Sequence, residues 1–555
     1  MPTASRPKRN RHQAQLASGA CPAPRDADLG NALASAPFRP KAKRRLKVDS
    51  NAFAFIIAVT HRFWAVAAAQ FDGQIQRFGL GAALGCLGKG ALGGGWKRVL
   101  VGHGGFFRLG LHRTYLGKGC VLDKRRTESK ERGAGKGEGR PDRSRKGALR
   151  LLEAVESGAT LDEAANLIER FSPAERARAR RLALETLRRV GRLEPILDKH
   201  LARRPRPEVL MLLRLATVEL LALNEAPHGV VNAAVALARD MGPKGIAAAG
   251  MVNAVLRKVA GETEAWAALE PQEMPDWLRE PVVAAWGEEV ARKIEAAHEL
   301  GAPLDLTAKP GLTAPGEALP TGSFRQPTGA RVSTLPGYAT GDWWVQDAAA
   351  SLAAKVLDAQ PGEEIADLCA APGGKTLQLA AAGAKVTALD ISQQRLARVA
   401  ENLARCRLKA KLLNGDALDF EVEDELDAVL LDAPCSATGT IRRHPDLPLI
   451  RDGSGIRELT RLQADLIDHA LGMIKPGGRL VYATCSLLPA EGEDQIAAAL
   501  ARNPDLVVER PDLPGLDPEW ITPEGYLRLR PDFWPDRGGM DGFFIARLRI
   551  SADPT

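Results

Sequence analysis

The stretch EIADLCAAPGGKT, residues 364–376, decides the fold class of this chain. Its first five residues form a short, mostly apolar run that is typical of a buried strand. A turn with Pro372, Gly373 and Gly374 follows, and the apolar run LQLAAAG (residues 377–383) then continues as a predicted helix. Strand, glycine-rich turn and helix in this order begin a βαβ unit, so we expect a parallel sheet covered by helices.

The same alternation continues toward the C-terminus and predicts a doubly wound, Rossmann-like α/β sheet within residues 341–551. The further expected strands are KVTALD (385–390), AKLLNGDA (410–417), LDAVLLDAPC (426–435) and RLVYATCS (479–486). The expected helices are SQQRLARVAENLARC (392–406) and LQADLIDHALGMI (462–474), the latter followed by a KPGG turn at 475–478. Ligands of such sheets bind at the carboxyl ends of the strands.

The glycine-rich loop favours a nucleoside ligand without a phosphate clamp. A phosphate-binding P-loop would need glycine where this chain has Cys369, and the loop also lacks the GxGxxG pattern of dinucleotide-binding proteins. Gly373 and Gly374 allow close approach of the backbone to a ligand. Asp390 ends the next strand, where a carboxylate can bind two ribose hydroxyls, and Asp416 ends the third, where it can accept from an adenine amino group. Together these features suggest S-adenosylmethionine.

Two cysteines at predicted strand ends indicate the reaction. Cys435 and Cys485 fall at the catalytic edge of one sheet, whereas Cys406 lies in a helix and is interpreted as a small buried hydrophobic residue. The C5 atom of cytosine is a poor nucleophile toward a methyl sulfonium. A thiolate that adds at C6 converts the ring into an enamine and makes C5 reactive, and a second group then assists elimination.

Residues 146–262 have a helical pattern with little strand signal and predict an all-α domain. Residues 210–223 are the most apolar helix and are predicted to be buried. The arginines of this region suit a solvated face and RNA contact equally well. Residues 263–340 are expected to hold a helical linker and a small RNA-binding subdomain of strands and turns. Trp343 and Trp344 after it are interpreted as core residues and not as RNA-stacking platforms.

Residues 1–145 are interpreted as a basic extension, either disordered or the product of a wrongly assigned start codon. Residues 1–146 contain 29 Lys and Arg against 9 Asp and Glu, while the remaining 409 residues contain 47 against 59. The net charge of +8 therefore does not by itself show that the folded part binds nucleic acid.

Composition excludes several classes of protein. The 555 residues are 45% hydrophobic and 26% charged, which is ordinary for a multidomain globular chain. Seven scattered cysteines without CxxC spacing suit a reducing compartment and indicate no metal site. Because we find no membrane span and no secretory signal, we expect a cytoplasmic protein.

Two parts of the chain resemble known families. Residues 214–241 and 251–258 (MVNAVLRK) resemble the second half of the NusB fold, a small helical RNA-binding domain. The catalytic part resembles the Sun/Fmu-type RNA cytosine-5 methyltransferases, through the motifs DLCAAPGGKT (367–376), LDIS (389–392), NGDA (414–417), LLDAPCSATGTIRRHPD (430–446), YATCSLLPAEGED (482–494) and DGFFIARL (541–548).

The second resemblance implies roles for individual residues. Cys485 would attack C6, and Cys435 would assist release of the methylated product. The residues that would line the S-adenosylmethionine pocket are Cys369, Ala370, Ala371, Pro372, Gly373, Gly374, Lys375, Asp390, Asp416 and Asp432. DNA cytosine-5 methyltransferases use the cysteine of a Pro-Cys motif instead, so the opposite assignment of the two thiols stays open.

The resemblance implies C5 methylation of a cytosine in 16S rRNA by a monomer that binds neither membrane nor DNA. Two alternatives remain open: the same chemistry on tRNA or another rRNA site, and a non-catalytic RNA-binding protein. Arg442, Arg443 and His444, next to the DAPC motif, are either phosphate contacts near the flipped base or a plain surface loop.

Overall fold

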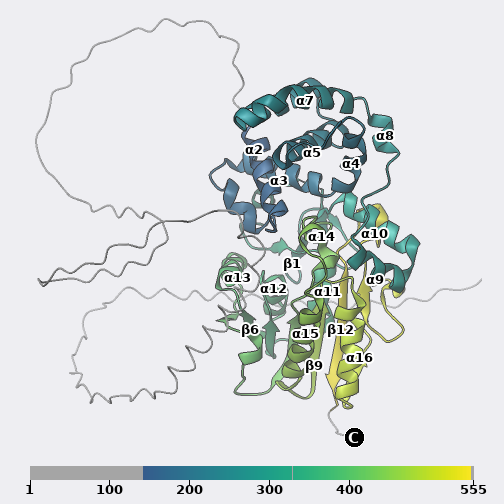
Figure 1. Cartoon of the computed structure of the whole chain (residues 1–555). Coiled ribbons are helices and arrows are strands. Elements are labelled where there is room, and N and C mark those ends of the chain that lie inside the picture. Colours follow the sequence, from purple (N-terminus) through teal and green to yellow (C-terminus); the bar gives the residue numbers. More distant parts are fainter. Residues whose placement is uncertain (1–141, 328, 552–555) are drawn as a thin grey trace, which may run out of the picture. The chain divides into compact units, whose positions relative to one another are not determined.

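The computed structural model describes residues 142–327 and 329–551, so nearly all of the predicted N-terminal extension lies outside the described residues. The first part is helical (Figure 1). Its α-helices are α2 (Arg143–Glu156), α3 (Pro173–Leu187), α4 (Val190–Asp198), α5 (Pro207–Leu221), α6 (Pro227–Asp240), α7 (Pro243–Val259) and α8 (Thr263–Ala267), with the 3-10 helix η1 (Glu163–Ile168). The predicted all-α part is confirmed.

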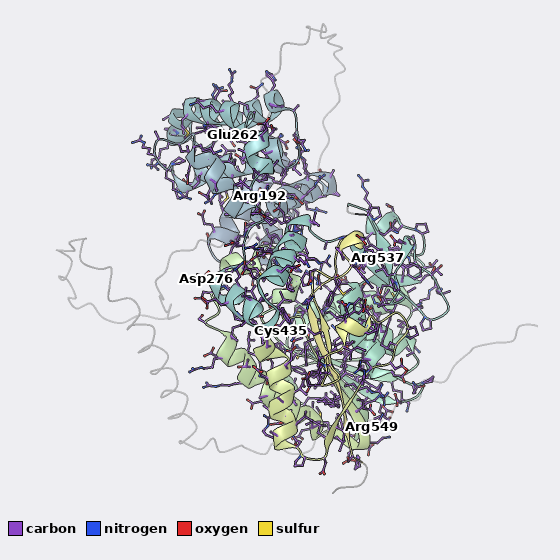
Figure 2. All side chains as sticks on the ribbon, turned by 90° about the vertical axis from the view of Figure 1, so that its right-hand side faces the viewer. Arg192, Glu262, Asp276, Cys435, Arg537 and Arg549 are labelled. Atoms are coloured by element: carbon purple, nitrogen blue, oxygen red, sulfur yellow. The ribbon has the colours of Figure 1, made fainter. Side chains whose placement is uncertain are left out.

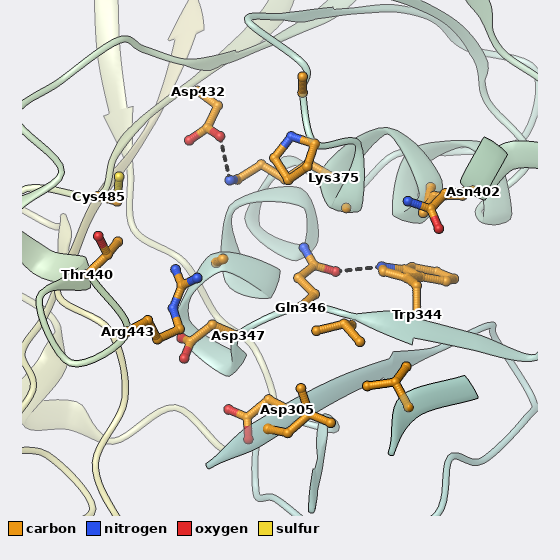
Figure 3. Close-up of a pocket in the computed structure, with 18 of the residues that line it drawn as sticks. Asp305, Trp344, Gln346, Asp347, Lys375, Asn402, Asp432, Thr440, Arg443 and Cys485 are labelled. Carbon is orange, nitrogen blue, oxygen red and sulfur yellow. Dashed lines mark hydrogen bonds and ion pairs between the residues drawn. The ribbon is translucent and has the colours of Figure 1, made fainter. Parts of the chain in front are cut away.

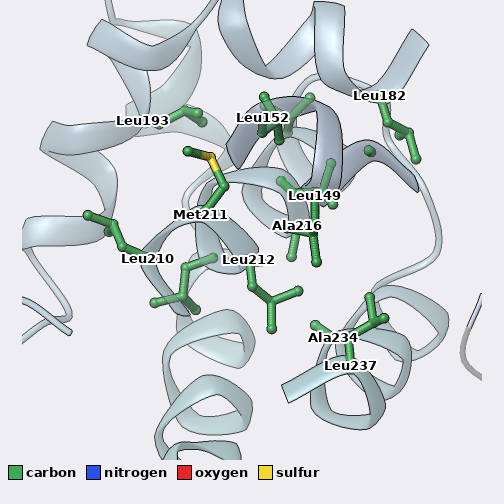
Figure 4. Packing of buried hydrophobic residues seen from close by; sticks show 14 of the residues in the cluster. Leu149, Leu152, Leu182, Leu193, Leu210, Met211, Leu212, Ala216, Ala234 and Leu237 are labelled. Atoms are coloured by element: carbon green, nitrogen blue, oxygen red, sulfur yellow. The ribbon is translucent and has the colours of Figure 1, made fainter. Parts of the chain in front are cut away.

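Helix α5 is the centre of the helical core, as the apolar run predicted. All but three of its residues are buried, and it packs on α2, α3, α6 and α7. Figure 4 shows Leu210, Met211 and Leu212 of this helix among leucines of the neighbouring helices. Proline at the first position starts α3, α5, α6 and α7, where its missing N–H costs nothing and its fixed φ suits a helix.

Two helices and a small antiparallel sheet follow. The helices are α9 (Asp276–Trp286) and α10 (Glu288–Leu300), and the strands are β1 (Leu304–Ala308), β2 (Glu317–Ala318), β3 (Phe324–Gln326) and β4 (Trp343–Val345), in the order β2-β3-β1-β4. The 3-10 helix η2 (Val332–Thr334) precedes β4. Trp343 packs with Leu306 in the core of this sheet, and Trp344 is buried too, so the prediction of core tryptophans is confirmed.

The C-terminal part is an eight-stranded sheet with helices on both faces, which confirms the predicted α/β class. Its strands are β5 (Glu364–Leu368), β6 (Lys385–Asp390), β7 (Lys411–Asn414), β8 (Leu426–Asp432), β9 (Ile474–Thr484), β10 (Leu506–Glu509), β11 (Leu527–Leu529) and β12 (Phe543–Ile550). Its helices are α11 (Ala348–Leu357), α12 (Gly374–Ala381), α13 (Gln393–Cys406), α14 (Leu447–Ile450), α15 (Ile456–Leu471) and α16 (Glu493–Arg502). The 3-10 helices are η3 (Ala417–Asp419), η4 (Thr438–Thr440), η5 (Pro489–Glu491), η6 (Pro518–Trp520) and η7 (Pro535–Arg537).

The strand order is β10-β12-β9-β8-β5-β6-β7, and β11 pairs with β12. Strands β9, β8, β5, β6 and β7 are parallel, whereas β12 joins β9 antiparallel. The chain leaves β5 toward β6 on one side and returns later to β8 on the other. The loops after β5 and β8 therefore diverge, which opens a crevice at the carboxyl edge of the sheet.

One local prediction is wrong. The KPGG segment at 475–478, expected as a turn before the strand, lies inside β9. The pairing of β9 with β8 shifts between Leu426 and Ala428, and Gly477 takes a φ of 78°. The segment thus bulges out while the strand continues on both sides of it, because Gly477 can adopt the left-handed conformation that the bulge requires.

Among the described residues, no helix combines the length and the apolar character that crossing a bilayer demands.

A buried carboxyl group in β5 should make stability depend on pH. Asp367 is fully buried; its Oδ2 accepts a hydrogen bond from the Thr376 hydroxyl at 2.5 Å, and its Oδ1 has no hydrogen-bond partner. Burial raises the pKa of Asp367 from 3.8 to about 7. The folded chain therefore holds this proton more tightly than the unfolded chain between those values, and the resulting stabilisation is lost as pH rises through about 7.

We expect Asp367→Asn to gain stability relative to the wild type as pH rises from 4 to 8. The difference in free energy of unfolding should grow by at most about 1.4 kcal/mol per pH unit, because one proton is involved. Urea unfolding of both chains at pH 5, 6, 7 and 8 measures it. Glu364→Gln, at an exposed position of the same strand, is the control and should show no such trend. If the free energies of unfolding of Asp367→Asn and the wild type differ by the same amount at every pH, the prediction is contradicted.

Candidate active site

The predicted site residues gather at the carboxyl edge of the parallel strands, in the loops after β5, β6, β7, β8 and β9. The loop after β5 turns sharply: Cys369 has a φ of 62° and Gly373 a φ of 98°. A Cβ atom at Gly373 would lie 2.8 Å from the side chain of Val399, so only glycine fits between this loop and α13.

The first cavity at this edge, here called the carboxylate cavity, has a volume of about 490 Å³. It is lined by Cys369, Ala371, Leu389, Asp390, Ile391, Arg395, Gly415, Asp416, Ala417, Asp432, Ala433, Pro434, Cys435, Ala437, Leu462, Leu466 and Cys485. Five of the ten predicted cofactor residues are among them. The volume lies within the range of about 300–1,000 Å³ that is usual for small-molecule sites.

The carboxylates of Asp390 and Asp416 also accept hydrogen bonds from nearby backbone N–H groups. The Asp390 carboxylate accepts hydrogen bonds from the backbone N–H of Ala371 at 3.1 Å and of Ser392 at 2.8 Å, and it pairs with Arg395. The Asp416 side chain caps η3 by accepting from the N–H of Leu418. Each carboxylate oxygen has two acceptor sites, so these bonds leave capacity for a ligand in the cavity.

The second cavity, here called the lysine cavity, also has a volume of about 490 Å³ (Figure 3). The predicted residues Ala370, Ala371, Pro372, Gly374, Lys375 and Asp432 line it, whereas Gly373 lines neither cavity. The lining residues that were not among the predicted site residues include Asp305, Tyr338, Gln346, Asp347, Asn402, Thr440 and Phe543. The glycine-rich loop therefore lies between two cavities and lines both.

The buried Lys375 forms an ion pair with the half-buried Asp432 in the lysine cavity. The Lys375 Nζ donates to Asp432 Oδ2 at 2.7 Å and lies 5.1 Å from the centre of the Phe543 ring (Figure 3). Burial alone lowers the pKa of Lys375, but the charge and hydrogen bond of Asp432, together with Cys485 and Asp367, raise it overall. Lys375 therefore remains an ammonium group at neutral pH.

The two predicted catalytic thiols lie side by side. Cys435 follows β8 and Cys485 follows β9, and their Sγ atoms are 3.5 Å apart (Figure 2 labels Cys435). Ala371, Asp432 and Cys485 line both cavities, so the two spaces meet beside Cys485. The position of Cys485 is thus the one from which a thiol can reach a group held in either cavity.

The electrostatic surroundings distinguish the cysteines. The hydrogen bond to Cys485, burial, and the charges of Cys485 and Glu491 all raise the pKa of Cys435 well above its ordinary value. Cys435 therefore keeps its proton and can donate it to the Cys485 sulfur. Burial raises the pKa of Cys369 to about 12, which leaves it unreactive as a nucleophile. Cys406 is fully buried in an apolar cluster, as predicted.

The three basic residues after the DAPC motif have different surroundings. Arg442 is completely buried; it donates to the carboxylates of Asp347 and Asp541 at 3.0 and 3.3 Å and to a backbone carbonyl. The hypothesis of a phosphate contact is therefore wrong for Arg442, which holds the loop in place. The Arg443 side chain is 39% exposed, lines the lysine cavity and pairs with Asp541 at 2.5 Å. Burial and the charge of Arg443 lower the pKa of His444, which is therefore neutral at pH 7.

Glu491 is a buried acidic residue that the sequence patterns did not reveal, although it lies within a quoted motif. It is fully buried and accepts hydrogen bonds from the residues that follow both cysteines. Its neighbours in sequence, Pro489, Gly492, Glu493 and Asp494, are typical of a surface loop. No periodicity or spacing signals that this one acidic residue points inward.

Replacing Cys485 by alanine should lower the pKa of Cys435, because it removes the largest cause of the shift. Burial and Glu491 should still keep that pKa above the ordinary value. Alkylation of Cys435 by iodoacetamide, followed against pH by peptide mass spectrometry, should therefore begin at lower pH in Cys485→Ala than in the wild type. Cys406→Ala is the control and should leave the profile unchanged. If the pH profile of Cys435 alkylation is the same in Cys485→Ala and the wild type, the hydrogen bond between the two thiols does not raise the pKa of Cys435.

Comparisons with known proteins agree with both parts of the structure. The family described as 16S rRNA methyltransferase RsmB/F matches residues 354–549, and the NusB family matches residues 142–261. A crystal structure of the protein PH0851 covers 74% of this chain and 99% of its own, with a TM-score of 0.54 and 24% identity. This likeness shows a shared fold.

Two curated relatives cover most of the chain. Ribosomal RNA small subunit methyltransferase B of Klebsiella pneumoniae subsp. pneumoniae is 36% identical over 436 residues, which are 72% of this chain and 96% of the relative. The protein of the same name from Salmonella typhi is 35% identical over 426 residues, 71% and 95% of the two chains. The chain therefore belongs to the RsmB/F family of S-adenosylmethionine-dependent RNA methyltransferases.

Proposed function

We propose that this enzyme methylates C5 of a cytosine in 16S rRNA through a covalent bond between Cys485 and C6 of the base. One observation carries the proposal: two cavities meet at Cys485 and Asp432, and a second, protonated thiol lies 3.5 Å from Cys485. One cavity would hold S-adenosylmethionine and the other the flipped base, so that the methyl donor and C5 approach each other where the cavities join.

The carboxylate cavity suits S-adenosylmethionine. Asp390 would accept from two ribose hydroxyls, and Asp416 from the adenine amino group, as carboxylates at strand ends do in related nucleotide-binding folds. The apolar wall from Leu389, Ile391, Leu462 and Leu466 suits the face of an adenine ring. When bound, the cofactor supplies an electrophilic methyl group.

The lysine cavity suits a flipped cytosine. The Oδ1 of Asp432 can accept from the amino group of the base, and the Lys375 ammonium can donate to a ring nitrogen or carbonyl oxygen. Flipping a base out of a helix costs a few kcal/mol and least in an unpaired loop, which suits a single-stranded segment of RNA. Arg443, on the rim of this cavity, is placed to contact a phosphate of the flipped nucleotide.

The chemistry follows from the two thiols. The Cys485 thiolate would add to C6 and move the electron pair of the C5–C6 double bond to C5, which would then take the methyl group while the pair of the broken S–CH3 bond stays on the cofactor sulfur. A base, for which water suffices, would then take the C5 proton; the electron pair of the C5–H bond re-forms the C5–C6 double bond, and the pair of the Cys485–C6 bond leaves with the Cys485 sulfur. Cys435, whose raised pKa keeps it a thiol, lies where it can exchange a proton with Cys485 during this elimination.

We assign RNA binding to the NusB-like helical part, residues 146–262, and to the small subdomain within residues 263–340, with catalysis in residues 341–551. A monomer acting in the cytoplasm suits this assignment. The same chemistry on tRNA or on another rRNA site is the second candidate, because the choice of RNA rests on shape that the helical part recognises.

Incubation of the full chain with tritiated S-adenosylmethionine and, separately, with unmethylated 16S rRNA, 23S rRNA and tRNA tests the function. We expect label in 16S rRNA alone, at one cytosine, and mapping of 5-methylcytosine identifies the position. Label in tRNA or 23S rRNA would favour the second candidate. No label in any RNA, from a chain that binds the cofactor, would refute the proposal.

A two-thiol experiment tests the roles of the cysteines. Cys485→Ala should abolish methylation and all covalent RNA adducts, because the nucleophile is missing. Cys435→Ala should accumulate an adduct that survives denaturing electrophoresis, because addition proceeds and release fails. Cys406→Ala, a buried cysteine outside both cavities, is the matched control and should methylate normally. The reverse pattern would show that Cys435 is the nucleophile.

A further inference from the structure

A single buried carboxylate connects the loops that carry the two thiols. Glu491 ends η5 and is fully buried. Its Oε1 accepts from the backbone N–H of Ser436 at 2.8 Å and from the Gln463 side chain at 3.1 Å. Its Oε2 accepts from the hydroxyls of Ser436 and Ser486, each at 2.5 Å.

The two serines are the residues directly after the two cysteines. Ser436 follows Cys435 on the loop after β8, and Ser486 follows Cys485 on the loop after β9. The same carboxylate holds Ser436 through its backbone N–H and hydroxyl and Ser486 through its hydroxyl, one residue away from each sulfur-bearing cysteine. The serine hydroxyls also lie 3.2 Å from each other, so they and Glu491 form one compact buried network.

Other bonds join the same loops, and the Thr438 hydroxyl lies 3.1 Å from the Ser436 hydroxyl and 3.2 Å from the Ser486 hydroxyl. The N–H of Gly439 donates to the carbonyl of Cys485 at 2.9 Å, and the N–H of Leu487 donates to the Thr438 hydroxyl at 2.9 Å. These bonds fix the general approach of the loops. The carboxylate adds the charged acceptor to which both serine hydroxyls and the Ser436 N–H donate.

We propose that Glu491 is a positioning residue for the reaction: by binding Ser436 and Ser486 together, it sets the short distance between the thiols of Cys435 and Cys485. The proposal deepens the two-thiol chemistry proposed above and rests on it for its effect on methylation. Its structural half, the distance between the thiols, does not depend on that chemistry.

A carboxylate suits this position because all four of its neighbouring groups can donate. A buried carboxylate is costly unless its lone pairs are filled, and here four donors fill them. Glutamine has the same shape but only one acceptor oxygen, so its amide nitrogen would face the two serine hydroxyls and force them to reorient. Aspartate is one methylene shorter and cannot reach both loops from the same backbone position.

The backbone at Glu491 has its own anchors, which should preserve the fold when the side chain changes. Its carbonyl accepts from the hydroxyls of Tyr482 at 2.9 Å and Thr484 at 3.1 Å. Glu491 lines neither cavity. Loss of the carboxylate should therefore alter the geometry of the thiols without removing a ligand contact.

The test uses the full chain with Glu491→Gln and, as the matched control, Asp494→Asn, an exposed acidic position in α16. The first readout needs neither RNA nor cofactor: phenylarsine oxide bridges two adjacent thiols by forming two As–S bonds with release of one water. Cys435→Ala and Cys485→Ala, which each lack one of the two thiols, show how much of the binding of phenylarsine oxide needs both. We expect Glu491→Gln to weaken this bridging at least tenfold, with Asp494→Asn like the wild type.

The second readout is steady-state methylation of the RNA that the wild type modifies. Glu491→Gln should lower kcat at least tenfold while KM for the RNA and for the cofactor stays within about twofold, because neither cavity loses a contact. Unchanged bridging and unchanged kcat would overturn the proposal. A KM increase with normal bridging would also overturn it and assign Glu491 to substrate binding.

A further variant guards against misfolding. If thermal unfolding shows that Glu491→Gln is not folded, Ser486→Ala removes one arm of the network and should weaken bridging severalfold; normal bridging there would overturn the proposal. The arsenical readout is independent of methylation. A wild-type chain that bridges normally but methylates no RNA would therefore refute the proposed function. Weak bridging by Glu491→Gln, with normal bridging by the wild type and by Asp494→Asn, would support the positioning role.

Discussion

The parallel pairing of β8 with β9 is the constraint on which the site depends. Asp432, at the end of β8, is in register with Ala483 near the end of β9, and the neighbouring strands end at the same edge of the sheet. Cys435 and Cys485 follow within three residues of these positions. Adjacent parallel strands lie about 4.8 Å apart, so the ladder of backbone hydrogen bonds already brings the two sulfurs near each other before any side chain acts.

A second layer of charged groups keeps the loops in place. Arg442 lies buried between Asp347 at the start of α11 and Asp541 before β12, so segments almost 200 residues apart meet around one guanidinium group. Burial and Asp541 raise the pKa of Asp347 to about 6. Burial also favours protonation of Asp541, but Arg443 and Arg442 lower its pKa overall. Arg442 therefore helps to keep Asp541 charged, and it limits the rise in the pKa of Asp347.

Much of the sheet was predictable from the sequence, and the reasons are local. Strands β5 and β6 begin and end at the predicted residues, because a continuous apolar run bounded by glycine or charge admits few other structures. The rule that ligands lie at the carboxyl ends of strands placed Asp390, Asp432, Cys435 and Cys485 at one edge. The phosphate contact expected of Arg442 was wrong, because its burial depends on packing between distant segments. The patterns also did not predict that the loop after β5 would border two cavities. Glu491 could not be found because two of the three partner residues of its carboxylate, Ser436 and Gln463, lie 55 and 28 residues away in sequence.

The short distance between the thiols has a consequence for how such enzymes can diverge. The sulfurs differ by 3.5 Å in position, about the thickness of one aromatic ring, and both border the carboxylate cavity. Cys485 borders the lysine cavity as well, whereas Cys435 does not. The order of the strands brings both cysteines to this edge, so which of them faces the lysine cavity is a property of the loop that carries it, and it can change without a change of fold.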